Sequence, residues 1–323
     1  MRQELNKGID VLCKYILVKR TALIKCLEDP GYKEVKIPKS KKGEFRILHI
    51  PGENLKQVQR LILENIFYKL PVSGVAHCGI PKRSIKTNIE PHLRGRSFFK
   101  IDFKDAFPSV SRQMVRECLY SLIQQTFALS QEEVKNLAEI LSYLTTHKNV
   151  LPQGAPTSPY LLNLVCLELD KELVGIALRF GLNYTRYADD LWFSSSEKKI
   201  SKEARSEIIK AVQKYGFKIN REKIKYKTGT ATVAKITGVT LIPKECIPEA
   251  KTSIPRETLE EYRVKIHKAT YDLQISVNKI FGIMGWVRMA TGGEIPQRLK
   301  KVFRKFLEAR CPEKLPDYIS LLQ

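Results

Sequence analysis

The stretch YTRYADDLWFSS, from Tyr184 to Ser195, places two adjacent aspartates inside an apolar segment that is otherwise typical of a β-strand. Aspartate is depleted in strands, and a buried carboxylate is costly unless it is paired or binds a metal ion. We therefore predict a β-hairpin whose turn lies near Ala188–Asp190. Ordinary turn chemistry would account for the two acids if no other acidic group came close to them.

A second apolar strand, KIDFKDAF, has Asp102 at its end. If the two strands are neighbours, Asp102 and Asp189 converge on one point together with Asp190. Such a cluster of unpaired acids requires cations, and Mg²⁺ suits it because it prefers oxygen ligands, one or two carboxylates and substrate phosphates. Two such ions can stabilise the attacking and leaving oxygens of an in-line phosphoryl displacement. The three aspartates are therefore candidate metal ligands.

Positive charge is in large excess, with 56 Lys and Arg against 34 Asp and Glu and a formal net charge of +22. The excess is spread along the whole chain rather than concentrated in one tail. A soluble, lysine-rich surface would give the same number. The distribution favours a long polyanion that lies across several units of the protein, because Lys and Arg bind phosphates. A membrane surface is a weaker candidate, since no segment combines a basic face with a bulky aromatic one.

The cysteines, histidines and apolar runs argue against several other classes of protein. Seven cysteines and five histidines are scattered without a C-x-x-C pair or an H-E-x-x-H motif, so a disulfide framework or a thiolate or imidazole metal site is not expected. No apolar run approaches the roughly 18 residues that cross a bilayer. The N-terminus mixes acidic and basic residues around a short apolar segment and makes a poor signal peptide. We expect a cytoplasmic protein with no membrane partner.

Hydrophobic periodicity along residues 96–250 predicts strand, helix, helix, hairpin, helix and further β segments. SPYLLNLVCLELDKELVGIALRFG has the pattern of one long helix, with Ser158 as N-cap, Pro159 in the first turn and Gly181 after the last. FKIN, at 217–220, and AKITGVTLIP continue the β structure. This order predicts an α+β fold, a sheet backed by helices on one face rather than a doubly wound sheet.

The flanking segments are predicted in less detail. KKGEFRILHIP is typical of a strand, and NLKQVQRLILENIFYKL of an amphipathic helix that begins near Asn54. Either Ser109 or Ser111 caps the helix RQMVRECLYSLIQQ. PKECIPEAKTSIP, at 243–255, predicts a proline-punctuated linker before a helical C-terminal part. There, QRLKKVFRKFLEAR has apolar residues on one helical face and basic residues largely off it.

Five motifs occur in order along residues 40–250: IDFKDAFPS at 101–109, LPQGAPTSP at 151–159, YADD at 187–190, GFKIN with Lys223 nearby, and TGVTL at 237–241. This series resembles the reverse transcriptases, and most closely the bacterial retron type. NIEPH, at 88–92, is similar to the Asn-Ala-x-x-x-His-type element of that type, with isoleucine where alanine is usual. ITG, at 236–238, is similar to its Val-Thr-Gly, with isoleucine for valine.

The resemblance implies a right-hand polymerase with fingers, a palm built on an antiparallel sheet backed by helices, and a helical thumb. The fingers would comprise residues 1–95 with the helices around 110–150, the palm residues 96–250 and the thumb residues 251–323. Asp102, Asp189 and Asp190 would be the catalytic, metal-binding triad, joined by the backbone carbonyl of Phe103. Two Mg²⁺ ions would activate the primer hydroxyl and neutralise the pyrophosphate leaving group.

Five further residues are candidates for binding the incoming deoxynucleotide. Phe107 would lie under the sugar and exclude a 2′-hydroxyl, or it is an ordinary core aromatic. Gln153 and Gly154 form a turn before a helix, where the amide would contact nucleotide or template and glycine permits close approach. Arg46 either holds the triphosphate or faces solvent. Lys223 either donates a proton to pyrophosphate or is a solvated lysine at a strand end.

Other residues are candidates for binding nucleic acid. Thr237 and Gly238 resemble the primer-grip hairpin. Asn88 and His92 either handle RNA, as the family implies, or fix a local loop. Arg186 holds either the hairpin turn or the template.

In the thumb, core packing is the first interpretation of the apolar stripe. Its basic residues would grip an RNA stem through phosphates and shape, which suits an A-form helix. They are Lys301, Arg304 and Lys305.

The resemblance implies an RNA-directed DNA polymerase that copies part of its own structured noncoding RNA into a branched RNA–DNA product, msDNA. Its partners would be that RNA as template and primer, the RNA–DNA hybrid, dNTPs and a separate effector protein in antiphage defence. Two alternatives stay open. One is a reverse transcriptase of another bacterial class, such as the group II intron-like class. The other is a polymerase-like RNA-binding scaffold, against which the intact aspartates argue.

Overall fold

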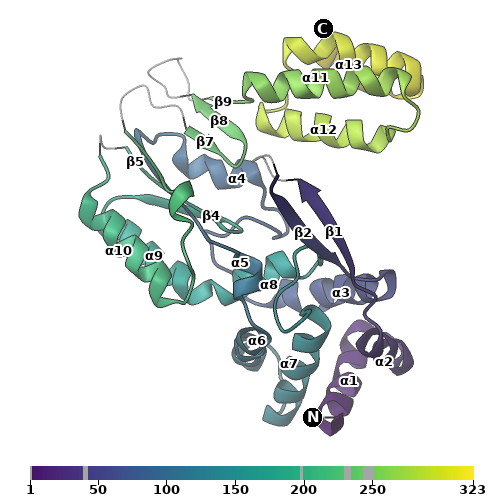
Figure 1. Ribbon diagram of the computed structural model, residues 1–323, viewed down its shortest axis with the longest axis vertical. Helices are drawn as coiled ribbons and strands as arrows, with labels where there is room; N and C mark the ends of the chain where they lie inside the picture. Colours follow the sequence, from purple (N-terminus) through teal and green to yellow (C-terminus); the bar gives the residue numbers. More distant parts are fainter. Residues whose placement is uncertain (1, 39–42, 197–198, 229–233, 243–250) are drawn as a thin grey trace.

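The computed structural model describes residues 2–38, 43–196, 199–228, 234–242 and 251–323. These residues form three regions, which Figure 1 shows with the N-terminus at the bottom and the C-terminus at the top. Helices and a projecting β-hairpin make up the N-terminal region, a sheet with its covering helices lies in the middle, and three long helices form the C-terminal region. The predicted α+β class with antiparallel sheets is confirmed.

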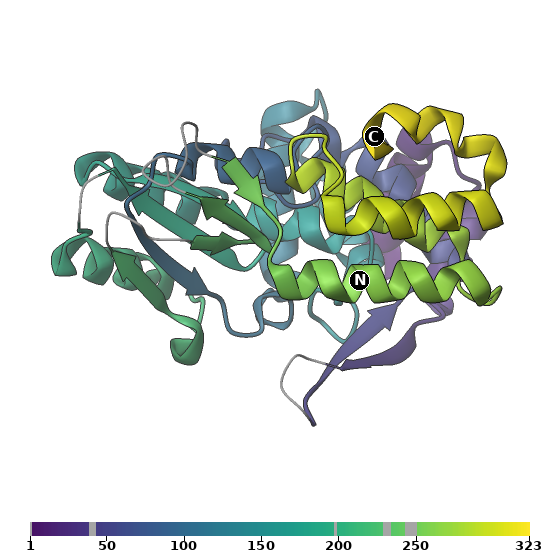
Figure 2. The same cartoon turned by 90° about the horizontal axis from the view of Figure 1, so that it is seen from above.

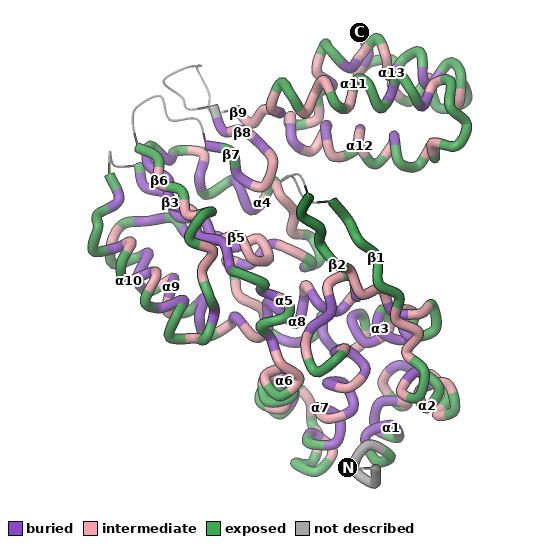
Figure 3. The backbone as a smooth tube through the Cα atoms, viewed as in Figure 1, coloured by how far each residue is buried: buried purple, intermediate pink, exposed green. Residues whose placement is uncertain are grey.

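The N-terminal region is a helical cluster from which the hairpin of β1 (Lys33–Pro38) and β2 (Phe45–Ile50) projects. The hairpin is the most exposed part of this region, as Figure 3 shows. Strand β2 was predicted, whereas β1 was not. Segments far apart in the chain make up the cluster: α1 (Arg2–Ile16), α2 (Arg20–Glu28), α3 (Glu53–Asn65), α6 (Arg112–Thr126) and α7 (Gln131–Thr145).

Four antiparallel strands form the central sheet in the order β4–β5–β3–β6. The hairpin predicted around the paired aspartates is β4 (Asn183–Tyr187) and β5 (Asp190–Ser195). Strand β3 (Ser97–Asp102) lies between β5 and β6 (Lys225–Thr228). The two acidic strands are therefore neighbours, which meets the condition on which the predicted convergence of the aspartates depends.

One face of this sheet is apolar and buries the larger core. Successive strand residues point to opposite faces, so Phe99, Ile101, Leu191 and Phe193 share this face. Leucine, isoleucine and valine side chains from the helices pack against them. These helices are α8 (Ser158–Val165), α9 (Leu167–Arg179) and α10 (Lys202–Lys214).

The opposite face is covered at the end away from the aspartates by α4 (Ile85–Ile89) and η2 (Glu90–His92). Ile89, Phe98 and Trp192 belong there to a second core that continues into the C-terminal region. A small sheet completes the junction, and its strands are β7 (Ala234–Ile236), β8 (Val239–Ile242) and β9 (Lys251–Ser253).

The C-terminal region packs α11 (Arg256–Tyr271), α12 (Val277–Ala290) and α13 (Gln297–Arg310) around this second core, with α14 (Ile319–Leu322) at the end. The predicted stripe of α13 is buried through Leu299, Phe303, Phe306 and Leu307. Figure 2 shows these helices from above, stacked beside the sheet region. No helix in the described ranges is both long and apolar enough to cross a membrane.

Several local predictions were wrong at element ends. The helix expected from Ser158 is two helices, because Cys166, with ψ near 1°, separates α8 from α9. Thr157, not Ser158, is the N-cap residue of α8. Of the two serines proposed to cap α6, Ser111 does so by accepting a hydrogen bond from the Met114 amide at 3.2 Å.

Two β predictions also need correction. FKIN forms only an isolated bridge through Ile219 to Phe103, and the edge strand β6 begins at Lys225. Residues 243–250 of the predicted linker, Cys246 included, lie outside the described residues. The rest of the segment is not a linker, because β9 pairs there with β8.

Candidate active site

The three aspartates meet at the edge of the central sheet where β3 ends and β5 begins. Asp102 and Asp190 are direct cross-strand partners, which places their side chains on the same face. Asp189 occupies the turn, and its carbonyl accepts a hydrogen bond of 3.0 Å from the Phe103 amide. Ala188 has φ of +54°, a conformation that is uncommon for a non-glycine residue. The predicted convergence of the three acids is therefore present.

Two lysines close to the aspartates offset part of this negative charge. The Lys100 ammonium lies 2.6 Å from Asp190 Oδ1. The Lys223 ammonium donates to both oxygens of Asp102, at 2.9 and 3.1 Å. Within the described ranges, no three His, Cys, Asp or Glu side chains have the spacing of a preformed metal site.

The carboxylates are held in an electrostatically unfavourable place. Burial raises the pKa of Asp190 to about 6; the Lys100 charge opposes this shift, and the hydrogen bond with Asp102 adds to it. Burial and the Asp102 charge also raise the pKa of Asp189, against the opposing effects of Lys223 and Arg46. Burial lowers the pKa of Lys223, but its hydrogen bond to Asp102 and the nearby aspartate charges leave it raised. The cluster therefore lacks positive charge.

The donor atoms are chemically suited to a hard divalent cation, although the three side chains do not have the spacing of a preformed site. Carboxylate oxygens from Asp102, Asp189 and Asp190 lie together, and such oxygens are the ligands that Mg²⁺ prefers. The raised pKa values of Asp189 and Asp190 show that their charged forms are disfavoured here, and a bound cation would stabilise those charged forms. The Phe103 amide holds its backbone against the turn, and a role of its carbonyl as a metal ligand stays a prediction.

A cleft of about 330 Å³ contains four of the five residues predicted to bind nucleotide. Arg46 and Leu48 line it from β2, Phe107 from α5 (Ala106–Ser109), and Gln153 and Gly154 from the loop before α8. The charge of Arg46 lowers the pKa of Asp189, so this cleft residue lies within electrostatic reach of the acidic turn. The fifth residue, Lys223, lies instead on Asp102.

The loop and the hairpin are fixed to each other by backbone contacts. The His49 amide donates to the Gln153 carbonyl at 2.7 Å. Gly154 has φ of +116°, and a Cβ there would lie 3.1 Å from the His49 carbonyl oxygen. Glycine is therefore required where β2 meets the loop.

Arg186 is fully buried and cannot touch a template in this structure. Its guanidinium forms a bidentate pair with Asp170, at 2.9 and 2.6 Å. Nη1 donates to Asn163 Oδ1 at 2.9 Å and to the Ala188 carbonyl at 3.2 Å. Of the two roles considered from the sequence, the geometry supports the one in which Arg186 holds the acidic turn.

Asn88 and His92 are also fully buried, so neither reaches bound RNA here. His92 contacts Ser194 Oγ through Nδ1 at 2.7 Å and Thr185 Oγ1 through Nε2 at 2.8 Å. Burial lowers the pKa of His92 to about 3, and the His77 charge adds to the shift, so the ring is neutral. Asn88 donates to Thr237 Oγ1 at 3.1 Å. Both residues thus join elements to each other.

The remaining candidates lie on the surface. Thr237 and Gly238 form the half-buried turn between β7 and β8. Lys301, Arg304 and Lys305 are exposed on α13, and Arg304 also donates to the Leu322 carbonyl at 3.1 Å. In Figure 1, α12 rather than α13 lies nearest to the β1–β2 hairpin. Contact between RNA and the α13 residues Lys301, Arg304 and Lys305 stays a prediction.

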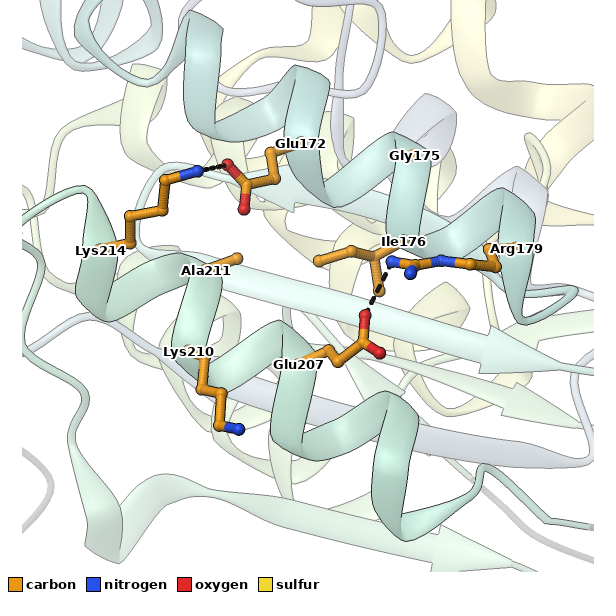
Figure 4. Close-up of a pocket in the computed structure, with 8 residues that line it drawn as sticks. All are labelled: Glu172, Gly175, Ile176, Arg179, Glu207, Lys210, Ala211 and Lys214. Atoms are coloured by element: carbon orange, nitrogen blue, oxygen red, sulfur yellow. Dashed lines mark hydrogen bonds and ion pairs between the residues drawn. The ribbon is translucent and has the colours of Figure 1, made fainter.

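A larger cleft, of about 680 Å³, lies between α9 and α10, on the helix-covered side of the sheet. Figure 4 shows that ion pairs cross it, with Lys214 on Glu172 at 2.6 Å and Arg179 on Glu207 at 2.7 Å. Because each of these carboxylates has a cationic partner and the aspartates face the other side, we do not assign chemistry to this cleft.

Sequence reasoning missed Lys100, Asp170 and Asn163. Lys100 precedes Asp102 by two residues, so strand alternation could have placed both on one face. Asp170 lies at helical spacing on the apolar stripe of Cys166, Leu173 and Ala177, and an acid on such a stripe indicates a buried partner. Nothing in the local sequence of Asn163 points to Arg186.

Residues 37–241 match the family described as "Reverse transcriptase (RNA-dependent DNA polymerase)". The chain is 36% identical over 283 residues to the retron Mx65 reverse transcriptase of Myxococcus xanthus, covering 83% of this chain and 62% of that protein. It is 34% identical over 230 residues to the retron Ec86 reverse transcriptase of Escherichia coli, covering 70% and 67%. The chain therefore spans less than two thirds of the Mx65 protein.

Among solved structures, apo telomerase from Candida tropicalis superposes with a TM-score of 0.51 at 11% sequence identity. The match covers 90% of this chain and 57% of that one. At this identity the likeness concerns the fold alone.

The buried Arg186 gives a test of how the acidic turn is supported. Arg186→Met leaves Asp170 buried without its cation, and we expect a loss of about 3–5 kcal/mol in the free energy of unfolding. Arg186→Lys keeps the positive charge but not the bidentate contact with Asp170, so its free energy of unfolding should fall by less. The exposed Arg179–Glu207 pair is the control, since Arg179→Met should cost less than about 1 kcal/mol. Equal unfolding midpoints for the two methionine variants in a denaturant titration would contradict the assignment.

The raised pKa of Asp190 predicts pH-dependent cation binding. Below about pH 6 this carboxyl holds a proton in the folded protein, and a cation must displace it. Affinity for Mn²⁺, followed by electron paramagnetic resonance, should rise as the pH passes through about 6 and then level off. Asp190→Asn should flatten the curve in this window. The same Mn²⁺ affinity at pH 5 and pH 7.5 in the parent protein would count against the prediction.

Proposed function

Because this chain belongs to the reverse transcriptase family, we propose that it is an RNA-directed DNA polymerase. The observation that carries the proposal is the cross-strand pairing of Asp102 with Asp190, with Asp189 in the adjoining turn. A cleft of about 330 Å³ lies within electrostatic reach of these carboxylates through Arg46. The positive charge of the chain supports a nucleic-acid substrate.

In this proposal, Asp102, Asp189 and Asp190, with the Phe103 carbonyl, hold two divalent cations, of which Mg²⁺ is the natural choice. Bound there, the ions neutralise charge on the reacting phosphate and activate the primer hydroxyl. The cleft binds the incoming dNTP. There Arg46 faces the triphosphate of the nucleotide and Phe107 lies against its sugar. Gln153 and Gly154 form the wall that meets the base or the template. Lys223 supplies a proton to the departing pyrophosphate.

We assign the three regions to the parts of a right-hand polymerase. Residues 1–95 and the helices around 110–150 are the fingers, 96–250 the palm and 251–323 the thumb. The β1–β2 hairpin and α12 lie on the same side of the molecule, which supports binding of template and primer between fingers and thumb (Figure 1).

Within the family we propose the retron type. Its support is the identity with retron reverse transcriptases of Myxococcus xanthus and Escherichia coli over most of this chain. The Asn88–His92 and Ile236–Gly238 elements agree with it. The enzyme would then copy its own structured noncoding RNA into branched msDNA, and serve antiphage defence with a separate effector protein in the cytoplasm.

The polymerase proposal predicts the behaviour of Asp189→Asn. This change removes one cation ligand and keeps the size of the side chain. Metal-dependent addition of dNTPs to a primer on an RNA template should fall to background, while affinity for the template–primer stays within about twofold. Glu172→Gln, in the cleft behind the sheet, is the control and should extend primers normally. Primer extension by Asp189→Asn at the parental rate would refute the proposal.

The retron proposal predicts what copurifies with the protein. Nucleic acid extracted from the purified protein should contain a DNA strand joined to RNA through a 2′-branch. Sequencing before and after treatment with a debranching enzyme measures this. Linear cDNA alone would assign the chain to another class of bacterial reverse transcriptase and leave the polymerase proposal intact.

A further inference from the structure

The turn between β7 and β8 contains a threonine in an unfavourable conformation. Ile236 pairs with Val239, so Thr237 and Gly238 are the two central residues of the turn, with φ of +49° and +87°. Two-residue hairpins with positive φ at both positions favour asparagine, aspartate and glycine. A β-branched residue at positive φ is an outlier. The backbone conformation therefore does not explain why a threonine occupies this position, and we look for a role of its side chain.

The hydroxyl of Thr237 is held by a distant, buried amide. Asn88 Nδ2 donates to Thr237 Oγ1 at 3.1 Å across 149 positions of sequence. This contact occupies an acceptor site on the hydroxyl oxygen and leaves its proton for another acceptor. Thr237 is half-buried at the surface. The hydroxyl is thus presented as a donor.

Asn88 itself is fixed to the central sheet. Thr185 Oγ1 donates to the Asn88 carbonyl at 3.1 Å. Because this uses the only Thr185 hydroxyl proton, His92 Nε2 must donate to Thr185, and His92 Nδ1 accepts from Ser194. The result is one directed chain of hydrogen bonds from β5 through His92 and Thr185 to the helix that carries Asn88.

The surroundings of the turn leave room for a ligand backbone. A Cβ added at Gly238 would meet only the ring of Trp286, at 3.6 Å. Asn88 Oδ1 is buried without a hydrogen-bond partner, so this amide is not optimised as a closed core group. The side-chain hydrogen bond that Asn88 does form is the one from Nδ2 to Thr237 Oγ1.

We propose that Asn88 is a positioning residue, which aims the Thr237 hydroxyl proton at a phosphate oxygen of nucleic acid bound over the Thr237–Gly238 turn. The inference rests on the proposed function, because it requires a nucleic-acid substrate. It assigns the RNA-handling role of the Asn88–His92 element to Thr237, the surface residue at the end of the hydrogen-bond chain. Asn88 and His92 act through it and do not touch the RNA.

The test measures binding of a short fluorescent RNA–DNA hybrid by anisotropy at fixed salt, without dNTPs. Thr237→Gly removes the hydroxyl and suits the positive φ, and should weaken affinity about 3- to 10-fold, the range of one net hydrogen bond. Asn88→Ala should weaken it equally. The double variant should bind no worse than either single variant, because both remove the same contact. Thr237→Ser should bind like the parent.

Tyr184→Phe is the matched control for stability. It breaks the buried hydrogen bond of 2.8 Å to Asp170 on the other face of the sheet and leaves the Asn88–Thr237 bond intact, so it should lower the denaturation midpoint and keep the affinity for the hybrid. The inference would be overturned if the fold-losses in hybrid affinity of the two single variants multiplied in the double variant. It would also be overturned if Thr237→Gly bound the hybrid like the parent. The Thr237 variants decide it even where Asn88→Ala does not fold. A parent that extends primers while Thr237→Gly binds normally refutes only this inference, whereas a parent that neither binds nor extends refutes the proposed function as well.

Discussion

The antiparallel pairing of β3 with β5 in one register is the constraint on which the site depends. It brings Asp102 opposite Asp190 and forces like charges together at a partly buried sheet edge. The cost is visible in the raised pKa values of Asp189 and Asp190. Lys100 and Lys223 offset part of it from positions close to the aspartates. A one-residue slip would turn the acids toward the apolar helices, so the larger core fixes the register that the chemistry needs.

The two faces of the central sheet therefore have separate tasks. The apolar face packs against α8, α9 and α10 and determines stability, and Arg186 lies on this side of β4. From there its guanidinium reaches the Ala188 carbonyl, so a residue buried among the helices supports a turn whose side chains face the other way. The opposite face carries the acids at one end and the Asn88–His92 element at the other. Support and chemistry are thus joined through the backbone of a single hairpin.

Local sequence was sufficient for the features that depend on alternation and turns. The β4–β5 hairpin, the position of Asp102 at a strand end and the apolar stripe of α13 followed from periodicity. The break at Cys166 did not, because no proline or glycine marks it. Residues whose role is set by distant partners were beyond such reasoning. An arginine is normally expected at the surface, and nothing in the local sequence of Arg186 indicates otherwise. Only the fold places Asp170 and Asn163 beside it.

The Asn88–His92 element lies where the two hydrophobic cores meet, since Ile89 packs in the second core while His92 is bound to strands of the central sheet. It contacts both the β7–β8 turn and α12, so it links the C-terminal helices to the sheet that carries the aspartates. On the proposed function, changes in this element alter where the primer and template lie without altering the carboxylates. A hydrogen-bond network buried at a junction is well suited to this, because a neutral histidine and fixed hydroxyl donors admit one arrangement only. On the proposed function, the Asn88–His92 element thus acts on geometry, whereas the aspartates would supply the chemistry.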